Sequence, residues 1–416
     1  MALLGTMIKG LMAALLALGA LALPAGAATF SMKRGLNLDQ WVTWPSEDKW
    51  GDRRAILPYP EWRKFLKQDD LKALKDAGLD FLRMPVDPSP FLSDRTAALR
   101  DDLYASVLDS ARMINRAGLK VIVDPHLIPA GGNRKIGMGQ VMDDPAVFDA
   151  YAEVVRNMAK TLAREDPKQV ALELMNEPIV DCDANGTNLW PDRQKKLFAA
   201  ARASATRLTL ILTGGCYSNA ESLARIDPGT IPDDNIIWTF HSYDPFLLTH
   251  QGATWAGDFI QYVTGLPYPL TAVPKAQLDL TLDTIRDRIR AEAPWARQSG
   301  MLAYLDEQVA AMDSPEKLAA VMDAPFRTVD AWAKANGVRP QDITLGEFGM
   351  IRKEYGNGFV MPAAYRAAYV RDMIGRAEAH GFSWSVWSYG GAFGVVDAFD
   401  GEKAEPNVMD VIRSPR

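Results

Sequence analysis

Two short segments of the sequence, LELMNEP at 172–178 and GEFG at 346–349, each place a glutamate at the end of an apolar run of strand length. Glu177 follows Asn176 in the first segment, and Glu347 lies 170 positions further along the chain. Two carboxylates in one cavity could hydrolyse a glycosidic bond, because one can protonate the leaving oxygen while the other attacks the anomeric carbon. The alternative for a glutamate at a strand end is an ion pair, for example with Arg83.

The elements that could bring these glutamates together are eight apolar runs of strand length, which alternate with amphipathic stretches of helix length. The predicted strands lie at 32–38, 80–86, 120–126, 170–177, 208–214, 236–243, 343–349 and 382–388, and predicted helices lie at 60–77, 100–117, 145–165, 191–205 and 362–380. Glycines in DAGLD, RAGLK and EAHGF stand just past helix ends, where helices commonly stop. The pattern predicts an α/β fold, a (β/α)8 TIM barrel, with a doubly wound open sheet as the alternative.

The sixth strand-helix unit is oversized, because the residues from Pro245 to Gln341 separate the sixth and seventh predicted strands. We expect an enlarged insertion at about 245–340, with an aromatic first part and two or three helices in its later part. It could form the rim of a cleft or serve only in packing. No second domain boundary is evident, so residues 29–416 are predicted to form a single (β/α)8 catalytic domain.

The N-terminal segment predicts export from the cytoplasm. Lys9 precedes an apolar core from Leu11 to Leu23, which is followed by the small residues Ala25, Gly26 and Ala27. This is the pattern of a secretory signal peptide at residues 1–28, cleaved near Ala27 or Ala28. The alternative of an uncleaved anchor is disfavoured because the core is shorter than the roughly 20 residues of a spanning helix. We expect a secreted or periplasmic protein with no membrane span in its mature chain.

Composition narrows the choice of ligand. The 416-residue chain is 48% hydrophobic and 24% charged, with a formal net charge of −6 and a pI near 5.4. An acidic chain of this kind argues against nucleic acid as a partner and favours a neutral ligand. Its four histidines form no HExxH pair and there is no GxSxG motif, so we expect no metal and no cofactor. A monomer is the expected state.

Two cysteines are too few for a disulfide framework. Cys182 and Cys216 nevertheless follow the fourth and fifth predicted strands, which are neighbours in a barrel. A disulfide between two loops of the site is therefore a hypothesis that the sequence leaves open.

Polar or aromatic side chains gather at the C-terminal ends of six of the eight predicted strands, which form the catalytic face of such a barrel. His241 and Tyr243 stand two residues apart, so both could point to the same side of their strand. Any one of these side chains could be a satisfied structural group, but together they predict one site. They are Arg83, Asp124, His126, Asn176, Glu177, His241, Tyr243, Glu347 and Trp387.

Four segments, KRGLNLDQW, ALELMNEP, GEFG and WSVWSYGGAFG, carry a family resemblance that covers nearly the whole chain after the N-terminal segment. The sequence resembles glycoside hydrolase family 5, the cellulase family in the clan of retaining (β/α)8 glycosidases. The resemblance implies that Glu177 is the general acid/base, Glu347 the nucleophile, and Arg83 the residue that holds Glu347 ionised. It further implies that His126, Asn176, His241 and Tyr243 line the subsite of cleavage, and that Trp387 is the platform under the sugar ring.

The expected function is that of an endo-β-1,4-glucanase acting on a β-linked polysaccharide or oligosaccharide. A β-mannanase, a β-1,3-glucanase and a hydrolase of a bacterial exopolysaccharide stay open, because loops decide linkage and chain length. A sugar-binding protein without catalysis is a remote alternative. Further aromatic residues could stack on additional sugar units or only pack in loops; they are Trp41, Trp44, Trp255, Tyr262 and Tyr268.

Overall fold

The computed structural model describes residues 28–39, 42–57, 66–127, 135–183, 186, 188–397 and 402–414. Eight parallel strands close into a barrel in chain order, and β1 pairs with β8. This confirms the predicted (β/α)8 TIM barrel and excludes the open sheet. The strands are β1 (Arg34–Asn37), β2 (Phe81–Val86), β3 (Lys120–Pro125), β4 (Val170–Glu173), β5 (Thr209–Thr213), β6 (Ile236–His241), β7 (Ile343–Glu347) and β8 (Ser383–Val386). The predicted signal peptide lies outside the described residues, apart from Ala28.

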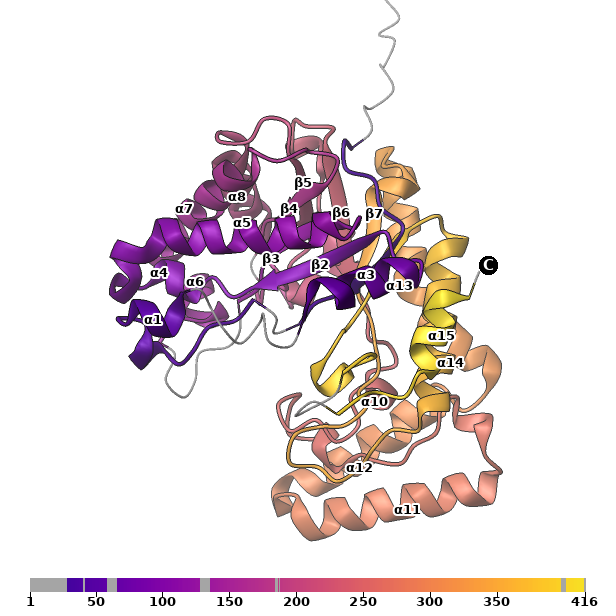
Figure 1. The fold of residues 1–416 in the computed structure, drawn as a ribbon. Coiled ribbons are helices and arrows are strands. Elements are labelled where there is room, and N and C mark those ends of the chain that lie inside the picture. The colour runs from indigo at the N-terminus through magenta and orange to yellow at the C-terminus, as the bar shows by residue number, and fades with distance from the viewer. Residues whose placement is uncertain are drawn as a thin grey trace, which may run out of the picture.

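Helices surround the barrel (Figure 1). The longer ones around it are α3 (Gln68–Asp76), α5 (Arg100–Arg116), α7 (Pro145–Leu162), α8 (Trp190–Arg202), α13 (Pro315–Asn336), α14 (Ala363–Ala379) and α15 (Asn407–Arg413). Shorter ones are α1 (Arg53–Ile56), α4 (Ser89–Leu92), α6 (Met138–Asp143) and α9 (Ala220–Leu223). The 3-10 turns are η1 (Glu47–Lys49), η2 (Asp94–Leu99), η3 (Cys216–Ser218), η4 (Pro228–Thr230), η5 (Ile260–Tyr262), η6 (Leu270–Ala272), η7 (Pro340–Asp342) and η8 (Gly391–Phe393).

The predicted helices correspond to α3, α5, α7, α8 and α14, and their ends follow from local chemistry. The side chain of Asp144 accepts hydrogen bonds from the backbone of the first turn of α7, and Pro145 occupies its first position. Gly337, with φ 68°, ends α13 in the left-handed region. Residues 60–65 of the helix predicted at 60–77 lie outside the described residues.

The barrel interior is apolar at its N-terminal end and polar at its C-terminal end. The apolar layer consists of Phe81, Ile122, Ala171, Ile211 and Ile237, and Phe30 and Met32 from the chain before β1 pack against it. Because side chains alternate along a strand, the residue two positions later faces the same side. Those positions hold Arg83, Asp124, Glu173, Thr213 and Thr239, all buried. A period of two thus changes a packed floor into a polar layer below the site.

Gly35 in β1 is required by the ring of Phe81. A Cβ atom at residue 35 would lie 2.3 Å from the tip of that ring, which is closer than side-chain carbons approach one another. The phenyl ring fills the space at the bottom of the barrel that the missing side chain leaves. The interior is therefore a packed core at this level, as is usual for barrels of eight strands.

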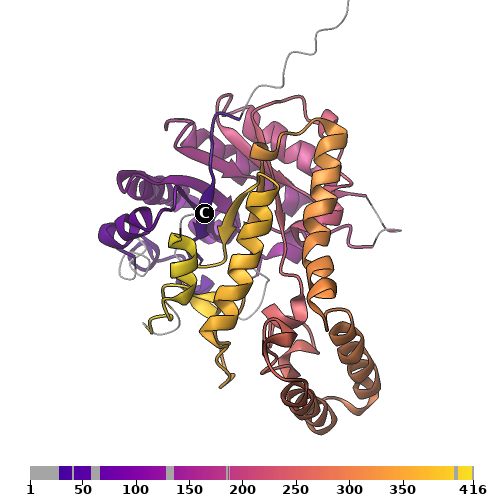
Figure 2. The same cartoon turned by 90° about the vertical axis from the view of Figure 1, so that its right-hand side faces the viewer.

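The predicted insertion between the sixth and seventh strands is present. It contains α10 (Phe246–Thr249), α11 (Lys275–Glu292) and α12 (Trp295–Ala310), and the last two project away from the barrel (Figures 1 and 2). α13 then returns along the barrel, where Phe326 packs edge-on against Phe240 of β6 and Trp332 against Trp238. Helix α13 thus takes the place of a barrel helix, so only the residues before it form the projecting part.

Across the described part of the chain, no helix combines the length and the apolar character that crossing a membrane requires.

Candidate active site

Arg83 on β2 is the centre of the polar layer. Its Nε and Nη2 donate to the two carboxylate oxygens of Glu173 on β4, at 2.7 and 2.9 Å. Nη1 donates to Asn37 Oδ1 at 3.0 Å, and Nη2 lies 2.9 Å from Asp124 Oδ2. Burial opposes the charge, but the adjacent carboxylates raise the pKa of Arg83 above its usual value. A permanent positive charge, held from three strands, therefore stands under the site.

Glu347, the last residue of β7, is held at both carboxylate oxygens. Arg83 Nη1 donates to Oε1 at 2.6 Å, and the hydroxyl of Tyr243 donates to Oε2 at 2.9 Å. Burial keeps Tyr243 protonated, because it raises the pKa of the phenol well above its usual value. The carboxylate is 4% exposed and has a fixed orientation, as a nucleophile requires.

Glu177 stands three residues beyond Leu174, outside the regular part of β4, and has a left-handed φ of 39°. Its side chain is 27% exposed, so it reaches the open face of the site. Burial raises its pKa to about 7, although the charges of His126 and Arg83 act against this. A carboxyl group of this kind can hold a proton at neutral pH and give it up.

His241 joins the two glutamates. Its Nδ1 lies 2.8 Å from Glu177 Oε1 and 3.7 Å from Glu347 Oε2. Burial lowers the pKa of His241 to about 4, so the ring is neutral at neutral pH. With a carboxylate oxygen on either side of Nδ1, we place the single ring proton there. His241 Nε2 is buried and has no hydrogen-bond partner among the described residues.

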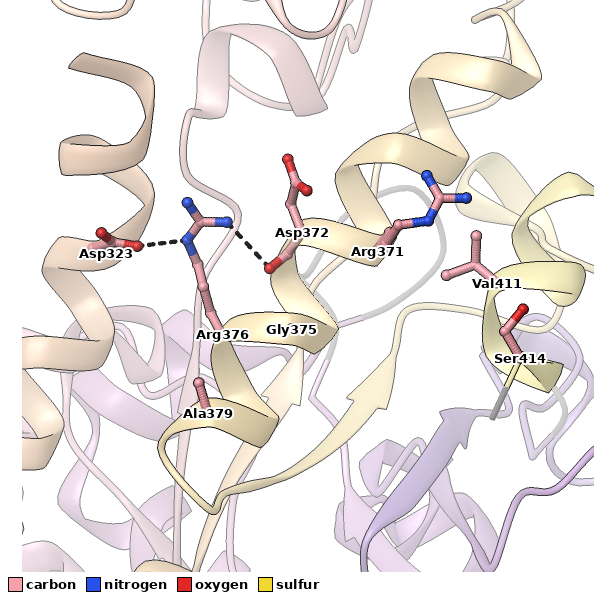
Figure 3. Close-up of a pocket in the computed structure, with 8 residues that line it drawn as sticks. All are labelled: Asp323, Arg371, Asp372, Gly375, Arg376, Ala379, Val411 and Ser414. Carbon is pink, nitrogen blue, oxygen red and sulfur yellow. Dashed lines mark hydrogen bonds and ion pairs between the residues drawn. The ribbon is translucent and has the colours of Figure 1, made fainter. Parts of the chain in front are cut away.

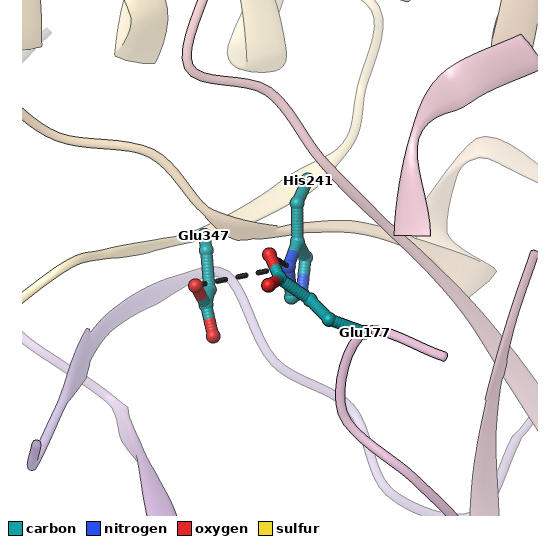
Figure 4. Close-up of side chains that lie close together, drawn as sticks. All are labelled: Glu177, His241 and Glu347. Carbon is teal, nitrogen blue, oxygen red and sulfur yellow. Dashed lines mark hydrogen bonds and ion pairs between the residues drawn. The ribbon is translucent and has the colours of Figure 1, made fainter. Parts of the chain in front are cut away.

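Figure 4 shows the side chains of Glu177, His241 and Glu347 converging from three segments of the barrel mouth. One carboxylate oxygen from each glutamate and one ring nitrogen of His241 all lie within 4.8 Å of one another. Carboxylate oxygens this near to one another are compatible with the roughly 5–5.5 Å between carboxyl groups in retaining glycosidases. Among the described residues, Glu177, His241 and Glu347 are also the group that could ligate a metal ion. However, the two oxygens of Glu347 already accept hydrogen bonds from Arg83 and Tyr243.

A second row of residues continues from Arg83 to the surface. Arg83 Nη2 donates to Asn176 Oδ1 at 2.7 Å, and Asn176 Nδ2 lies 3.2 Å from His126 Nε2. His126 Nδ1 is 2.9 Å from Asp124 Oδ2, and its ring stacks on Trp387 with centroids 5.5 Å apart. Each amide and ring orientation is thereby set by its neighbour. Asn176 keeps one amide proton for a ligand.

All eight site residues predicted from the sequence thus belong to one connected cluster. Asp124, noted in the sequence at the end of the third predicted strand, belongs to the cluster as well. Three further residues that the sequence prediction did not name hold it together: Asn37, Asp39 and Glu173. Asn37 and Asp39 stand at the end of β1, which was not among the strands noted for a polar end. Glu173 lies within LELMNEP, four residues before Glu177. It stands two residues after the apolar Ala171, and this spacing could have indicated that its side chain faces the barrel interior.

Asp39 connects the loops that follow β1 and β8. Its Oδ1 accepts a hydrogen bond from the backbone N–H of Gly390 at 3.0 Å. A Cβ atom at Gly391, whose φ is +72°, would lie 2.5 Å from Asp39 Oδ2. Burial raises the pKa of Asp39 to about 7, with the Gly390 and Ser388 hydrogen bonds acting against it. Glycine at 391 in SYGGAFG is therefore favoured by its positive φ and by the close approach of the Asp39 carboxylate.

The hypothesis of a disulfide between two site loops is confirmed, since Cys182 and Cys216 are bonded. The loop after β5 also donates two backbone hydrogen bonds to the segment after Glu177: Cys216 N–H to the Val180 carbonyl at 2.8 Å, and Tyr217 N–H to the Pro178 carbonyl at 3.2 Å. Three consecutive residues at 216–218 have positive φ values between 42° and 59°. Such a run is costly for residues other than glycine and needs support from its surroundings.

The additional aromatic residues separate into two groups. Trp44 and Tyr268 are 4% and 1% exposed, so of the two alternatives that the sequence left open for them, packing is the one that holds. Tyr268 instead packs edge-on against Tyr369 and donates to Asp372. Trp255 is 58% exposed, and Trp41 lies outside the described residues. Burial of this kind depends on the loops above each ring, which the sequence pattern did not reveal.

A separate hollow of about 520 Å³ lies between α13, α14 and α15 (Figure 3). Two of its charged side chains form an ion pair, because Arg376 Nε is 2.7 Å from Asp323 Oδ1, and Arg376 Nη1 also donates to the Asp372 carbonyl. None of the eight predicted site residues lines it. Its lining is Asp323, Arg371, Asp372, Gly375, Arg376, Ala379, Val411 and Ser414.

A closed (β/α)8 barrel with two glutamates this close at its C-terminal mouth has the architecture of a retaining glycoside hydrolase. Residues 55–393 match the model of the cellulase family, glycosyl hydrolase family 5. The chain therefore belongs to this family, whose members are retaining glycoside hydrolases.

The relatives of the chain are distant in sequence. Endoglucanase C from Acetivibrio thermocellus is 24% identical over 240 residues, which are 58% of this chain and 65% of the relative. The chain thus spans just under two thirds of that relative.

Solved structures match more of the chain. The cellulose synthase subunit Z of Clostridioides difficile has a TM-score of 0.61 at 20% identity and covers 92% of this chain and 99% of its own. Cel5A from Thermotoga maritima has a TM-score of 0.62 at 19% identity, with coverages of 92% and 97%. At these identities the structural matches establish the fold alone.

Proposed function

We propose that the chain is a secreted endo-β-1,4-glucanase that hydrolyses its substrate by double displacement, with Glu347 as nucleophile and Glu177 as acid/base. The observation that carries the proposal is that two glutamates with carboxylate oxygens at most 4.8 Å apart lie in different surroundings. Glu347 is clamped at both oxygens by Arg83 and Tyr243, whereas Glu177 is partly open and has a pKa raised to about 7. Environments that differ in this way suit a nucleophile and a proton donor.

In the first step, Glu347 attacks the anomeric carbon and forms an ester bond to it. The bond from that carbon to the glycosidic oxygen breaks, and the leaving oxygen takes the proton of Glu177. Arg83 and Tyr243 hold the attacking carboxylate in position, so little reorganisation is needed at the moment of reaction. His241 donates Nδ1–H to Glu177 Oε1, which leaves Oε2 to carry the transferable proton.

In the second step, a water molecule attacks the anomeric carbon from the side the leaving group vacated. Glu177 accepts a proton from this water, the ester bond to Glu347 breaks, and the sugar leaves with its original configuration. Esterification has meanwhile removed the negative charge of Glu347. The loss of this neighbouring negative charge lowers the pKa of Glu177. Glu177 is then ionised at neutral pH and can act as the base that this step needs.

Asn176 and Trp387 are proposed to orient the sugar at the cleaved bond. The free amide proton of Asn176 can donate to the hydroxyl beside the anomeric carbon, and hydrogen bonds at this position strengthen in the transition state of glycosidases. Trp387, backed by His126 at 5.5 Å, offers a supported ring for the face of a sugar.

The choice of a β-1,4-glucan is supported by the endoglucanases among the relatives. A β-mannan is the second candidate, because structures of Thermotoga maritima Cel5A are known with mannotriose as well as with cellobiose. The likeness to a cellulose synthase subunit also favours keeping a bacterial exopolysaccharide among the substrates to be tested. Export through the predicted signal peptide at 1–28 would bring the enzyme to such polymers.

The test is the release of reducing ends by protein that begins at Ala28, compared with its Glu347→Gln variant. The substrates are carboxymethylcellulose, barley β-glucan, glucomannan, laminarin and short β-linked oligosaccharides. Release from the β-1,4-glucans by the unmodified protein alone supports the proposal, and release from glucomannan alone transfers it to β-mannan. Equal behaviour of the two proteins on every substrate would refute the catalytic assignment.

A further inference from the structure

The segment that precedes β1 forms part of the barrel core. Phe30 and Met32 are 1% and 6% exposed, and both pack against the apolar layer at the N-terminal end of the barrel. Ala28, the first residue that the structure describes, packs partly against the same layer. We call this layer, together with Phe30 and Met32, the floor of the barrel. It lies at the opposite end from the mouth with the two glutamates, so the chain from Ala28 onward closes the floor.

Three consecutive backbone N–H groups hold this segment in place, and each donates to a side chain at the N-terminal end of a strand. The bond from Thr29 measures 2.8 Å and the bond from Phe30 measures 3.0 Å. The N–H of Ala28 donates to the carboxylate of Asp342, which ends η7 directly before β7. From Ala28 to Phe30, the three acceptors are the side chains of Asp342, Asn235 and Thr209. Of the three N–H groups, the one of Ala28 is thus the one that faces a carboxylate.

The carboxylate of Asp342 is buried and can accept a second charged donor. The residue is 9% exposed, and Arg339 donates to its two oxygens through Nε at 2.7 Å and Nη2 at 2.8 Å. Burial raises the pKa of Asp342, whereas the bonds from Arg339 and from the Ala28 N–H act to lower it. An ionised carboxylate has about four lone-pair positions, so it can accept from Arg339 and from another cation together.

The sequence places a cleavable bond directly before this contact. Ala25 and Ala27 occupy the two small-residue positions of a signal-peptide cleavage site, which predicts hydrolysis between Ala27 and Ala28. Hydrolysis adds the OH of a water molecule to the Ala27 carbonyl carbon and its remaining H to the Ala28 nitrogen, and the new amine takes up a proton at pH 7. An uncharged N–H that donates to Asp342 thereby becomes an ammonium at the same place. Hydrogen bonds between charged groups are roughly twice as strong as neutral ones.

We propose that a signal peptidase cuts the Ala27–Ala28 bond and that the new α-ammonium of Ala28 pairs with Asp342, which fastens the floor of the barrel. Cleavage one residue later would instead place the ammonium of Thr29 at the amide oxygen of Asn235 and would remove the backbone donor of Asp342. Removal of residues 1–27 therefore completes the fold as well as releasing the protein. The inference rests on the export in the proposed function and does not depend on catalysis.

The first experiment identifies the N-terminus of the exported protein. The full chain is expressed in a bacterial host, and mass spectrometry of the intact protein from the periplasm and the medium should give the mass of residues 28–416. The variant Ala27→Leu should no longer give this mass, because signal peptidases need a small residue before the bond they cut. A protein that begins at Thr29 or later, or one that keeps residues 1–27, refutes the proposal.

The second experiment measures the ion pair in protein that begins at Ala28, released from a fusion by a protease that leaves no added residue. Enzymatic acetylation of the α-amino group removes its charge and should lower the melting temperature by about 1–2 °C. The difference should vanish in Asp342→Asn, which keeps an acceptor but carries no charge. Asp80→Asn is the matched control and should keep the difference, because Asp80 accepts from the backbone N–H of Arg34 in the same segment, at 2.6 Å. No difference in the native sequence, or the same difference in Asp342→Asn, overturns the pair.

The third experiment titrates the α-amino group of Ala28 by NMR in protein with isotope-labelled alanine. The pKa of this group should lie above its usual range, because the negative charge of Asp342 favours the ammonium, although Arg339 opposes it. In Asp342→Asn the pKa should fall below the usual range, since the charge of Arg339 remains. An equal pKa in the two proteins contradicts the ion pair.

The second and third experiments give a result whether or not the protein is an active enzyme. If the protein releases no sugar but acetylation acts through Asp342, the ion pair stands and the catalytic proposal fails. If sugar is released and acetylation has no effect on the melting temperature, the ion pair alone fails.

Discussion

Arg83 Nη1 lies 2.6 Å from Glu347 Oε1, so a guanidinium on β2 fixes a carboxylate on β7 that is 264 positions away in the sequence. The same guanidinium donates to both oxygens of Glu173 and is shielded from solvent, since Arg83 is 1% exposed. Its planar fork serves five neighbouring side chains at once, which a lysine ammonium could not do; they are Asn37, Asp124, Glu173, Asn176 and Glu347.

Arg83→Lys should lower kcat by about a hundredfold or more, because the nucleophile loses a directed donor and the polar layer loses several hydrogen bonds. It should also lower the free energy of unfolding by about 1–3 kcal/mol, because lysine keeps the charge but leaves buried acceptors without their hydrogen bonds. Initial rates on an aryl β-cellobioside and urea unfolding measure the two effects. Arg112→Lys is the control, because Arg112 pairs with Glu165 at the surface; a similar loss there would contradict the special role of Arg83.

The dependence of kcat/KM on pH should show a basic limb near pH 7. Glu177 is active as a proton donor only while protonated, and burial raises its pKa to about 7, so the rate falls as pH rises through that value. In Glu177→Gln the limb should vanish along with most of the activity on substrates with poor leaving groups. A pH–rate profile on cellotetraose, with a glycosyl fluoride as the substrate that needs no acid, makes the comparison. An unchanged limb in the variant would assign the proton to another group.

Glu347 should carry the covalent intermediate. A 2-deoxy-2-fluoro-β-cellobioside with a good leaving group should add one fluorosugar to the protein. The good leaving group lets the ester form, and the fluorine slows its hydrolysis enough for the ester to be detected. Peptide mass spectrometry should find the label on the peptide that contains Glu347. Protein with Glu347→Gln should remain unlabelled. A label on Glu177 would exchange the two assigned roles.

Glu173 should contribute to the pH dependence of stability. Burial raises its pKa from the ordinary 4.5 to about 7, with the charge of Arg83 acting against this and those of Asp124 and Glu347 adding to it. A carboxyl group with a raised folded-state pKa stabilises the fold fully below pH 4.5, and this contribution is lost as pH rises toward 7. The melting temperature should therefore fall across this window, and less steeply in Glu173→Gln. Glu153→Gln, at an exposed surface pair, should keep the original slope; equal slopes in all three proteins would exclude the effect.

The Cys182–Cys216 disulfide should support the loop that follows Glu177. Replacing both cysteines by serine should lower the free energy of unfolding by about 2–4 kcal/mol, because the bond closes a loop across a separation of 34 residues. The fall in kcat should be smaller than that of Glu177→Gln, since backbone hydrogen bonds from Cys216 and Tyr217 still hold the loop. Chemical unfolding and initial rates decide the matter. A loss of activity as large as that of Glu177→Gln would mean that the disulfide itself positions the acid.

Much of the fold was predictable because the sequence of a barrel of parallel strands has a simple pattern. Several strands are apolar for a few residues and then end in a polar side chain, as in IIWTFH of β6 and ITLGE of β7. The eight predicted strands correspond to β1 to β8, and the predicted insertion falls between β6 and β7. The role of α13 as a barrel helix was not foreseen, because helical periodicity does not say which neighbour a helix packs against.

The sequence by itself determined the strand-helix rhythm and the residue types at the barrel mouth, because these depend on local periodicity and on chain direction. The tertiary structure alone decided which of those residues touch. It placed Asn37 and Glu173 on Arg83, buried Trp44 and Tyr268, and left Trp255 exposed but anchored. These outcomes depend on contacts between segments far apart in the chain. A hydrogen bond of 2.6 Å across 264 residues follows from the closure of the barrel, which no local pattern encodes.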